Sequence, residues 1–205
     1  MRLFTVDSFT DRPFEGNPAA VCVLDKSLPD GKCLAIAQEM NLSETAFVYK
    51  EDNVYHLKWF TPEVEVDLCG HATLATAKVL FDIYHVEEEV LNFNTKSGVL
   101  AVKKVEEYFE MNFPLGDLSA VLDGDVLLNE ALGATPLEVF ENGDWCLVRF
   151  EDETQVKDLE PNFSKLLEHS YKKFIVTAKS NNNSYHFISR FFAPALGINE
   201  DPVTG

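Results

Sequence analysis

The chain has 205 residues, 46% of them apolar and 12% aromatic, which suits one or two globular domains and excludes a disordered or fibrous protein. Its 34 acidic and 17 basic residues give a net charge of -17, which argues against nucleic acid or an anionic membrane as a partner, because phosphate binding needs a basic surface. Four cysteines without a CxxC pair, no signal peptide and no apolar run of roughly 18 to 20 residues are typical of a cytoplasmic protein.

The first half of the chain predicts one enclosed helix surrounded by β-structure. Asp30 is expected to cap a helix that runs to Met40. A second helix, His71–Tyr84, is apolar on most of its circumference, which is typical of a helix enclosed by other structure. Apolar runs between turn signals predict strands at 3–9, 19–24, 45–50, 55–60, 90–95, 98–104 and 108–113.

The second half repeats this mixture of strands and helices. The segment 114–117 is the expected boundary, which divides a lobe 1–115 from a lobe 116–205. Helices are predicted at 126–132 and 163–169. The strands predicted here are 137–140, 145–150, 173–178 and 185–191.

An internal repeat supports this division. Tyr55–Val66 runs parallel to Tyr185–Ile198, and the loop Glu65–His71 is a variant of Glu200–Gly205. A strand, an aromatic pair, a proline and a Gly-containing turn thus occur twice, which indicates a duplicated domain. In the first copy the turn leads into the apolar helix, whereas in the second copy the chain ends where that helix should begin.

Several motifs, in the same order, resemble the signatures of the phenazine biosynthesis-like (PhzF) family. They are Asp7-Ser8-Phe9 with Gly16-Asn17-Pro18-Ala19, Asn41-Leu42-Ser43-Glu44-Thr45-Ala46-Phe47, Phe60-Thr61-Pro62 with Asp67-Leu68-Cys69-Gly70-His71-Ala72-Thr73, and Glu200-Asp201-Pro202-Val203-Thr204-Gly205. The resemblance implies an α+β fold of the diaminopimelate epimerase type: two similar lobes, each a β-barrel around a central helix, with the active site between them. Family members continue past Thr-Gly with Ser-Ala-His and a second central helix, so the second lobe is expected to be truncated here.

The resemblance also assigns the catalytic residues. Glu44 matches a glutamate that moves a proton on the substrate carbon, and its apolar surroundings are expected to raise the pKa of the carboxyl group. The alternative without a catalytic role is that Glu44 is a solvated residue at the end of a strand. His71 is expected to orient the substrate or relay a proton, although a lone histidine at a helix start is more often a surface or capping residue.

The remaining candidates are residues that bind or position the substrate. The free N-H groups at the start of the enclosed helix, with Gly70, predict a carboxylate site. Asn17, Thr204 and Gly205 are also expected to contact the substrate, Gly205 from the second lobe. Asp201 is expected to position a substrate amine or the histidine, but it could equally be an ordinary turn residue.

Cys69 offers a rival mechanism. In related epimerases and racemases, a cysteine in this loop works with a second cysteine from the other lobe. Thr204 occupies the second position here, and a threonine hydroxyl is too weak an acid to replace a thiol, so Cys69 is interpreted as a buried small residue or as a possible alternative base.

The sequence therefore predicts a cofactor-independent isomerase that moves a proton, and with it a double bond, in a small carboxylate-bearing metabolite. No spacing typical of a metal site, a P-loop or a dinucleotide motif is present, so neither metal nor cofactor is expected. The alternatives are a racemase or epimerase that uses Cys69, or a non-enzymatic interaction protein on the same fold. The expected partners are the substrate and a second copy in a homodimer.

A further expectation concerns the second lobe. A central helix buries several large apolar side chains at roughly 1.5 to 3 kcal/mol each. That sum rivals the roughly 5 to 15 kcal/mol net stability of a domain. The missing helix is therefore expected from a continuation of the same protein or from a second polypeptide, and the fragment alone is expected to be inactive.

Overall fold

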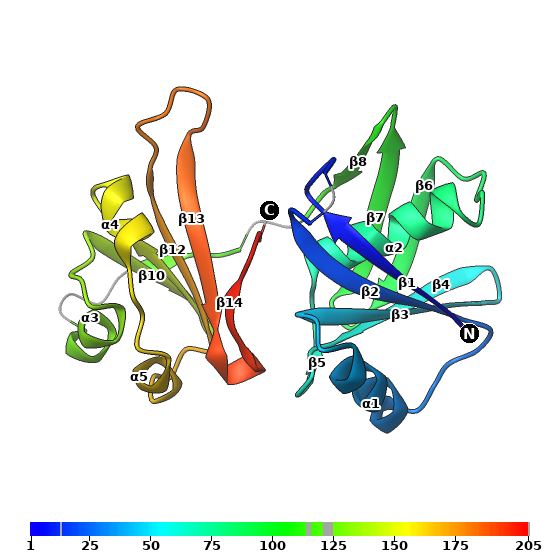
Figure 1. Ribbon diagram of the computed structural model, residues 1–205, viewed down its shortest axis with the longest axis horizontal. Helices are drawn as coiled ribbons and strands as arrows, with labels where there is room; N and C mark the ends of the chain where they lie inside the picture. The colour runs from blue at the N-terminus through cyan, green and yellow to red at the C-terminus, as the bar shows by residue number, and fades with distance from the viewer. Residues whose placement is uncertain (13, 114–115, 121–124, 205) are drawn as a thin grey trace. The chain divides into compact units, whose positions relative to one another are not determined.

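The computed structural model describes residues 1–12, 14–113, 116–120 and 125–204, and for Ala120 the backbone alone (Figure 1). The chain divides into two compact units, 1–114 with 203–205, and 115–202. Within the described residues, none of the helices combines the length and apolar character that crossing a membrane requires. Part of the predicted boundary segment, residues 114 and 115, lies outside the described residues.

The first unit is one sheet with two helices. Its end strands are β1 (Arg2–Ser8) and β8 (Tyr108–Met111), and the order is β1-β2-β3-β4-β6-β7-β8, with β5 paired to β4. The helices are α1 (Asp30–Met40) and α2 (Gly70–Asp82), and Figure 1 shows α2 within the curve of the sheet. The other strands are β2 (Asn17–Leu24), β3 (Glu44–Glu51), β4 (Val54–Phe60), β5 (Glu65–Val66), β6 (Val90–Thr95) and β7 (Gly98–Val105).

Local chemistry explains the ends of these elements. Asn41 ends α1 in the left-handed conformation at φ 50°. Glycine is the most common residue in this conformation at the end of a helix, and asparagine is the next. Asp52 and Asn53 take φ 48° and 64°, the two positive angles of a tight hairpin turn between β3 and β4. The prediction that Asp30 caps α1 is wrong: Pro29 holds the cap position, and Asp30 is the first helical residue.

The two faces of the first sheet are both covered. Alternate residues of the central strands, among them Cys22 and Phe47, pack with Cys33 and Ala37 of α1. On the opposite face of the sheet, the strands β1, β2 and β3 contact α2. Nine of the thirteen residues of α2 are buried, which confirms that this helix is enclosed.

The second unit is a sheet of six strands in the order β14-β13-β12-β11-β10-β9. Its helices are α3 (Val126–Leu132), α4 (Glu153–Asp158) and α5 (Phe163–Leu167), with a 3-10 turn at Pro194–Leu196. Phe174, Val176 and Cys146 point to the face that these helices cover. The strands are β9 (Ser119–Ala120), β10 (Glu138–Asn142), β11 (Trp145–Arg149), β12 (Lys173–Lys179), β13 (Phe187–Ala193) and β14 (Ile198–Asp201).

The pairing of the strands repeats between the two sheets. In the first sheet β1 and β2 are antiparallel, β2 and β3 parallel, and β3, β4 and β5 antiparallel. In the second sheet β10 and β11 are antiparallel, β11 and β12 parallel, and β12, β13 and β14 antiparallel. The strand β4 of the first repeat thus matches β13 of the second, as the sequence repeat requires. The α+β fold with two related sheets is confirmed.

One row of side chains shows where the two sheets differ. In the first sheet the partners Val21, Ala46 and Trp59 are at most 1% exposed, on the face that α2 covers. The matching row of the second sheet joins Phe140 to Leu147, Leu147 to Ile175, and Ile175 to Phe191, and all four residues are only half-buried. Within the described residues of the second unit, no helix covers this row. The expectation that a further helix fills it stays a prediction.

Candidate active site

Glu44 and His71 lie close together because β3 and α2 begin at neighbouring places in the first unit. Glu44 is the first residue of β3, and its register partner in the parallel strand β2 is Ala19. His71 is the second residue of α2. The Ser8 hydroxyl, at the end of β1, donates a hydrogen bond of 2.8 Å to the main-chain carbonyl of His71. β1 therefore fixes the first turn of the helix, a role for Ser8 that its place in the Asp7-Ser8-Phe9 motif did not reveal.

His71 lies between a thiol and a carboxyl group. Its Nε2 is 3.4 Å from Oε2 of Glu44, and its Nδ1 is 3.5 Å from Sγ of Cys69. The side chains of Glu44 and His71 are 12% and 5% exposed, and Cys69 is 7% exposed. In the neutral tautomer whose Nδ1 accepts a hydrogen bond from the thiol, the imidazole carries its N-H at Nε2, facing the carboxyl group. The three residues thus form a polar chain in a mostly buried place.

Burial sets the charge of this histidine. It lowers the pKa of His71 from 6.5 to about 4, because the imidazolium ion loses hydration inside the protein. His71 is therefore neutral near pH 7. Its contact with Glu44 is then a contact between a carboxyl group and an uncharged ring, and the carboxyl group stays available for chemistry.

The start of α2 provides an anion site beside this chain. Cys69 occupies the N-cap position and makes no side-chain capping bond, and the first N-H groups of a helix have no partner within the helix. A methyl group added at Gly70 would meet only the Phe113 ring, at 3.9 Å. The protein itself thus leaves open space at Gly70, where a ligand can approach the backbone.

The other sequence candidates lie in different places. Asn17 begins β2, is fully buried, and donates from Nδ2 to the main-chain carbonyl of Val203 at 3.0 Å. It therefore holds the segment that contains Thr204, which is exposed. Asp201 is the last residue of β14, half-buried, in the second unit. Gly205 lies outside the described residues.

The other three cysteines are inert by comparison. Burial raises the pKa of Cys22 and Cys146 to about 12 and that of Cys33 to about 11. Because the thiolate is the reactive form, these residues are structural. Cys69 differs in its contact with an imidazole at a helix start.

The structure collects three possible metal ligands that sequence spacing did not show. One atom each of Glu44, Cys69 and His71 lies within 4.8 Å of the others. However, the thiol faces Nδ1 and the carboxyl group faces Nε2, and one metal ion can bind only one of these nitrogens. The arrangement therefore fits a chain of polar contacts through the imidazole better than a metal centre.

We accordingly expect EDTA to leave the melting temperature of the protein unchanged. Zinc binding to such a set would shift the melting temperature, because a ligand that binds only the folded state stabilises it. Elemental analysis of the purified protein, with thermal melts before and after EDTA and after added zinc, tests this. A stoichiometric metal, or a melt that EDTA lowers, contradicts the prediction.

Comparison with known proteins agrees with this description. The family model described as phenazine biosynthesis-like protein (PhzC-PhzF) matches residues 6–205. The chain is 47% identical over 204 residues to a Halalkalibacterium halodurans protein named an uncharacterized isomerase, covering 99% of this chain and 77% of the relative. It is 38% identical over 235 residues to the human phenazine biosynthesis-like domain-containing protein, covering 99% of this chain and 79% of that protein.

Solved structures give the same result. A PhzF family phenazine biosynthesis protein of Enterococcus faecalis matches with a TM-score of 0.84 and 47% identity, over 99% of this chain and 77% of that one. A predicted epimerase of Pseudomonas aeruginosa, at 20% identity and a TM-score of 0.74 over 98% of this chain and 76% of that one, shares the fold. The chain belongs to the phenazine biosynthesis-like (PhzC-PhzF) family. The names of the curated relatives support an isomerase.

Proposed function

We propose that the protein is a cofactor-independent isomerase that moves a proton, and with it a double bond, within a small carboxylate-bearing metabolite. The observation that carries the proposal is the contact between the Glu44 carboxyl group and the neutral His71 ring at the open start of α2. A general acid or base, supplied by β3, and an anion site, supplied by α2, thus lie together at the first turn of that helix. This combination suits the removal of a proton from carbon next to a carboxylate.

The reaction follows from these positions. The Glu44 carboxylate takes a proton from a substrate carbon, and the electron pair of that C-H bond moves into an adjacent carbon-carbon bond as the double bond shifts. The same carboxyl group then returns the proton to another carbon of the substrate. No oxidant or reductant is consumed, because the atoms and electrons of substrate and product are the same.

His71 supports this step without competing for the proton. Since burial lowers its pKa to about 4, the ring remains an uncharged donor at Nε2. An imidazolium ion in this position would hold Glu44 in an ion pair and weaken it as a base. The helix start and the Gly70 backbone are proposed to hold the substrate carboxylate or the developing enolate.

Residues from elsewhere are proposed to complete the site. Asn17 holds the main chain at Val203 and so places Thr204 in the first unit. By the family resemblance, Asp201 positions a substrate amine or the histidine, and Gly205 contributes a backbone N-H to the carboxylate. A homodimer of the full-length protein is proposed on the same ground.

The substrate can be sought directly. Native mass spectrometry of a full-length version of the protein should reveal retained small carboxylic acids. Each retained acid is then incubated with the protein in deuterium oxide, and NMR follows the signal of its exchangeable C-H groups. Deuterium incorporation at carbon that needs no added cofactor supports the proposal. The proposal is contradicted if none of the retained acids exchanges a C-H proton with the solvent and no other small carboxylate does so either.

A second candidate function rests on the contact of 3.5 Å between Cys69 and His71. A thiol at a helix start, in contact with an imidazole that can take up its proton, has the arrangement of a cysteine base. Cys69 could then act as the base of a racemase or epimerase, with a partner group from elsewhere.

The variant Cys69→Ser separates the two candidates. If Glu44 is the base, this change should reduce the rate of exchange by less than about tenfold, because the small polar side chain is kept. If Cys69 is the base, the loss should reach about 10²- to 10⁴-fold. Cys33→Ser is the matched control, since Cys33 lies on the buried face of α1, and this change should leave the rate unchanged. Mild thiol alkylation followed by peptide mass spectrometry gives an independent measure of the reactivity of Cys69.

A further inference from the structure

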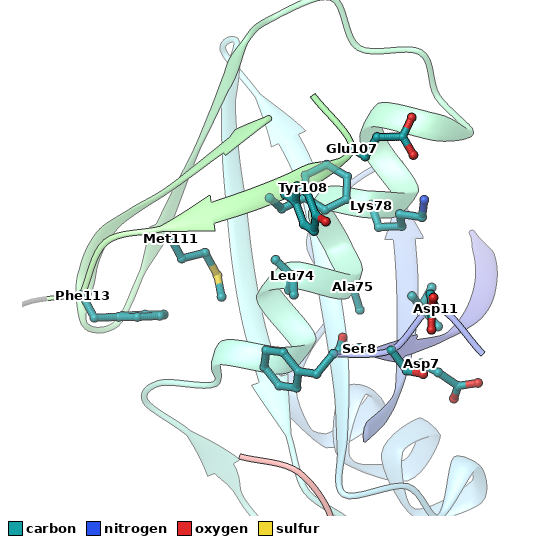
Figure 2. A pocket seen from close by; sticks show the side chains of 14 residues that line it. Asp7, Ser8, Asp11, Leu74, Ala75, Lys78, Glu107, Tyr108, Met111 and Phe113 are labelled. Carbon is teal, nitrogen blue, oxygen red and sulfur yellow. The ribbon is translucent and has the colours of Figure 1, made fainter. Parts of the chain in front are cut away.

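The first unit contains a pocket that the proposed reaction does not use. Its volume is about 670 Å³, within the roughly 300 to 1,000 Å³ typical of small-molecule sites. It lies between β1 and β8, the two end strands of the first sheet, and α2 contributes Leu74 and Ala75. Figure 2 shows these two side chains directed into the space between the strands. Glu44, Cys69 and His71 do not line it.

The pocket has an apolar lining. Leu74 of α2 faces Tyr108 and Met111 of β8, and Phe113 closes one side, as Figure 2 shows. The Tyr108 side chain is 76% exposed, so one face of its ring is available to a ligand. These groups can enclose a ligand body that is itself apolar.

Backbone strain occurs at the edge of the same pocket. Phe9, which lines it, has φ 64°, an unusual conformation for a bulky residue, and its side chain is 40% exposed. The chain beyond it packs tightly, since a Cβ at Gly16 would lie 2.2 Å from the Ser8 carbonyl oxygen. A strained residue that presents an aromatic ring to a pocket is more common at functional sites than elsewhere.

Charge selects the kind of ligand. Asp7, Asp11 and Glu107 line the pocket, whereas Lys78 is its one cationic lining residue among the described side chains. The Lys78 ammonium group is already paired, with its Nζ 2.5 Å from Oδ2 of Asp82. Asp11 has an exposed ion pair of its own, with Oδ1 3.9 Å from Nε of Arg12, which solvent screens. Figure 2 shows Asp7 and Asp11 on the same side of the pocket. The pocket therefore carries excess negative charge beside exposed aromatic rings, which attract cations.

We propose that this pocket binds an organic cation, an ammonium group on an aromatic or aliphatic body. The apolar body contacts Leu74, Met111 and Phe113. The ammonium group lies near Asp7 and Asp11, with the face of Tyr108 as a further contact. Ser8 lines the pocket and also donates to the main-chain carbonyl of His71, so the ligand lies one hydrogen bond from the first turn of α2.

Three indole compounds test the charge requirement. Tryptamine is cationic at pH 7, tryptophol is its neutral counterpart, and indole-3-acetate is the anionic one. Calorimetric titration of the full-length protein should show tryptamine binding about tenfold more tightly than tryptophol, and no measurable binding of indole-3-acetate. Raising the ionic strength from about 0.01 M to about 0.15 M should weaken tryptamine alone, because the screening length falls from about 30 Å to about 8 Å.

Variants of exposed residues locate the site without a risk to folding. The double change Asp7→Asn with Asp11→Asn should bring tryptamine to the affinity of tryptophol, and Asp52→Asn, in the β3-β4 turn, should leave it unchanged. Tyr108→Ala should weaken tryptamine by about threefold or more, whereas Tyr108→Phe should retain binding. Circular dichroism confirms that each variant is folded. Equal affinities for the three compounds, or tryptamine binding that neither Asp7, Asp11 nor Tyr108 affects, overturns the proposal.

Discussion

Replacing Glu44 with Gln is expected to abolish the incorporation of solvent deuterium into the substrate, with a loss of at least about 10² to 10⁴ in rate. The amide keeps the shape of the side chain and its contact with His71 but cannot take up a proton from carbon. Substrate binding should therefore remain nearly intact. NMR in deuterium oxide measures the exchange, and thermal stabilisation by the substrate measures the binding.

The control for this variant lies on the same strand. Glu51, at the opposite end of β3, is exposed, so Glu51→Gln removes an equal charge without touching the site. This variant should exchange deuterium at the wild-type rate. A Glu44→Gln protein that also exchanges at the wild-type rate would remove Glu44 from the mechanism, and the Cys69→Ser result would then decide whether the thiol is the base.

The second prediction with a large effect concerns stability at acid pH. Since the pKa of His71 is 6.5 in the unfolded chain and about 4 in the folded one, the unfolded state binds the proton first as the pH falls. The contribution of His71 to stability is fully present above pH 6.5 and is lost as the pH falls toward 4. Between pH 7 and pH 4.5 the loss from this residue is about 2 kcal/mol.

Between pH 7 and pH 4.5, the free energy of unfolding should therefore fall by about 2 kcal/mol less in the variant His71→Gln than in the wild type. The chain has two tryptophans, Trp59 in the first unit and Trp145 in the second. In a Trp145→Phe background, the fluorescence of Trp59 reports urea unfolding of the first unit alone. The exposed His85, replaced by Asn, serves as the control and should keep the wild-type pH dependence. Identical curves for His71→Gln and wild type would show that His71 is not held neutral.

Several features of the fold follow from local sequence signals. The helix predicted at 126–132 has the bounds of α3, and the structure shows why it starts and ends there: Asp125 caps its start, and Gly133 ends it in the left-handed conformation. The enclosed helix was predicted one residue late at its start and two residues late at its end, because helix ends carry weak signals. The helix α4 was missed, although Asp152 and Gln155 form a capping box before it.

Three short strands were not predicted from the sequence. β5 and β9 have two residues each, and β14 has four. A pattern of alternate apolar residues cannot be recognised over so few positions. Such strands exist because a partner strand supplies their hydrogen bonds, and for β5 that partner is the strand that precedes its turn.

The sequence by itself determined the duplicated organisation, the family resemblance and the residue types of the site, because repeats and motifs are properties of the order of residues. Only the tertiary structure decided that Cys69 and Glu44 lie at the two nitrogens of His71, that burial keeps this ring neutral, and that β1 and β8 enclose a pocket with α2. Glu44 and His71 are 27 positions apart, and β1 and β8 are about 100. Contacts over such separations, and the loss of hydration that shifts a pKa, depend on packing rather than on any local pattern.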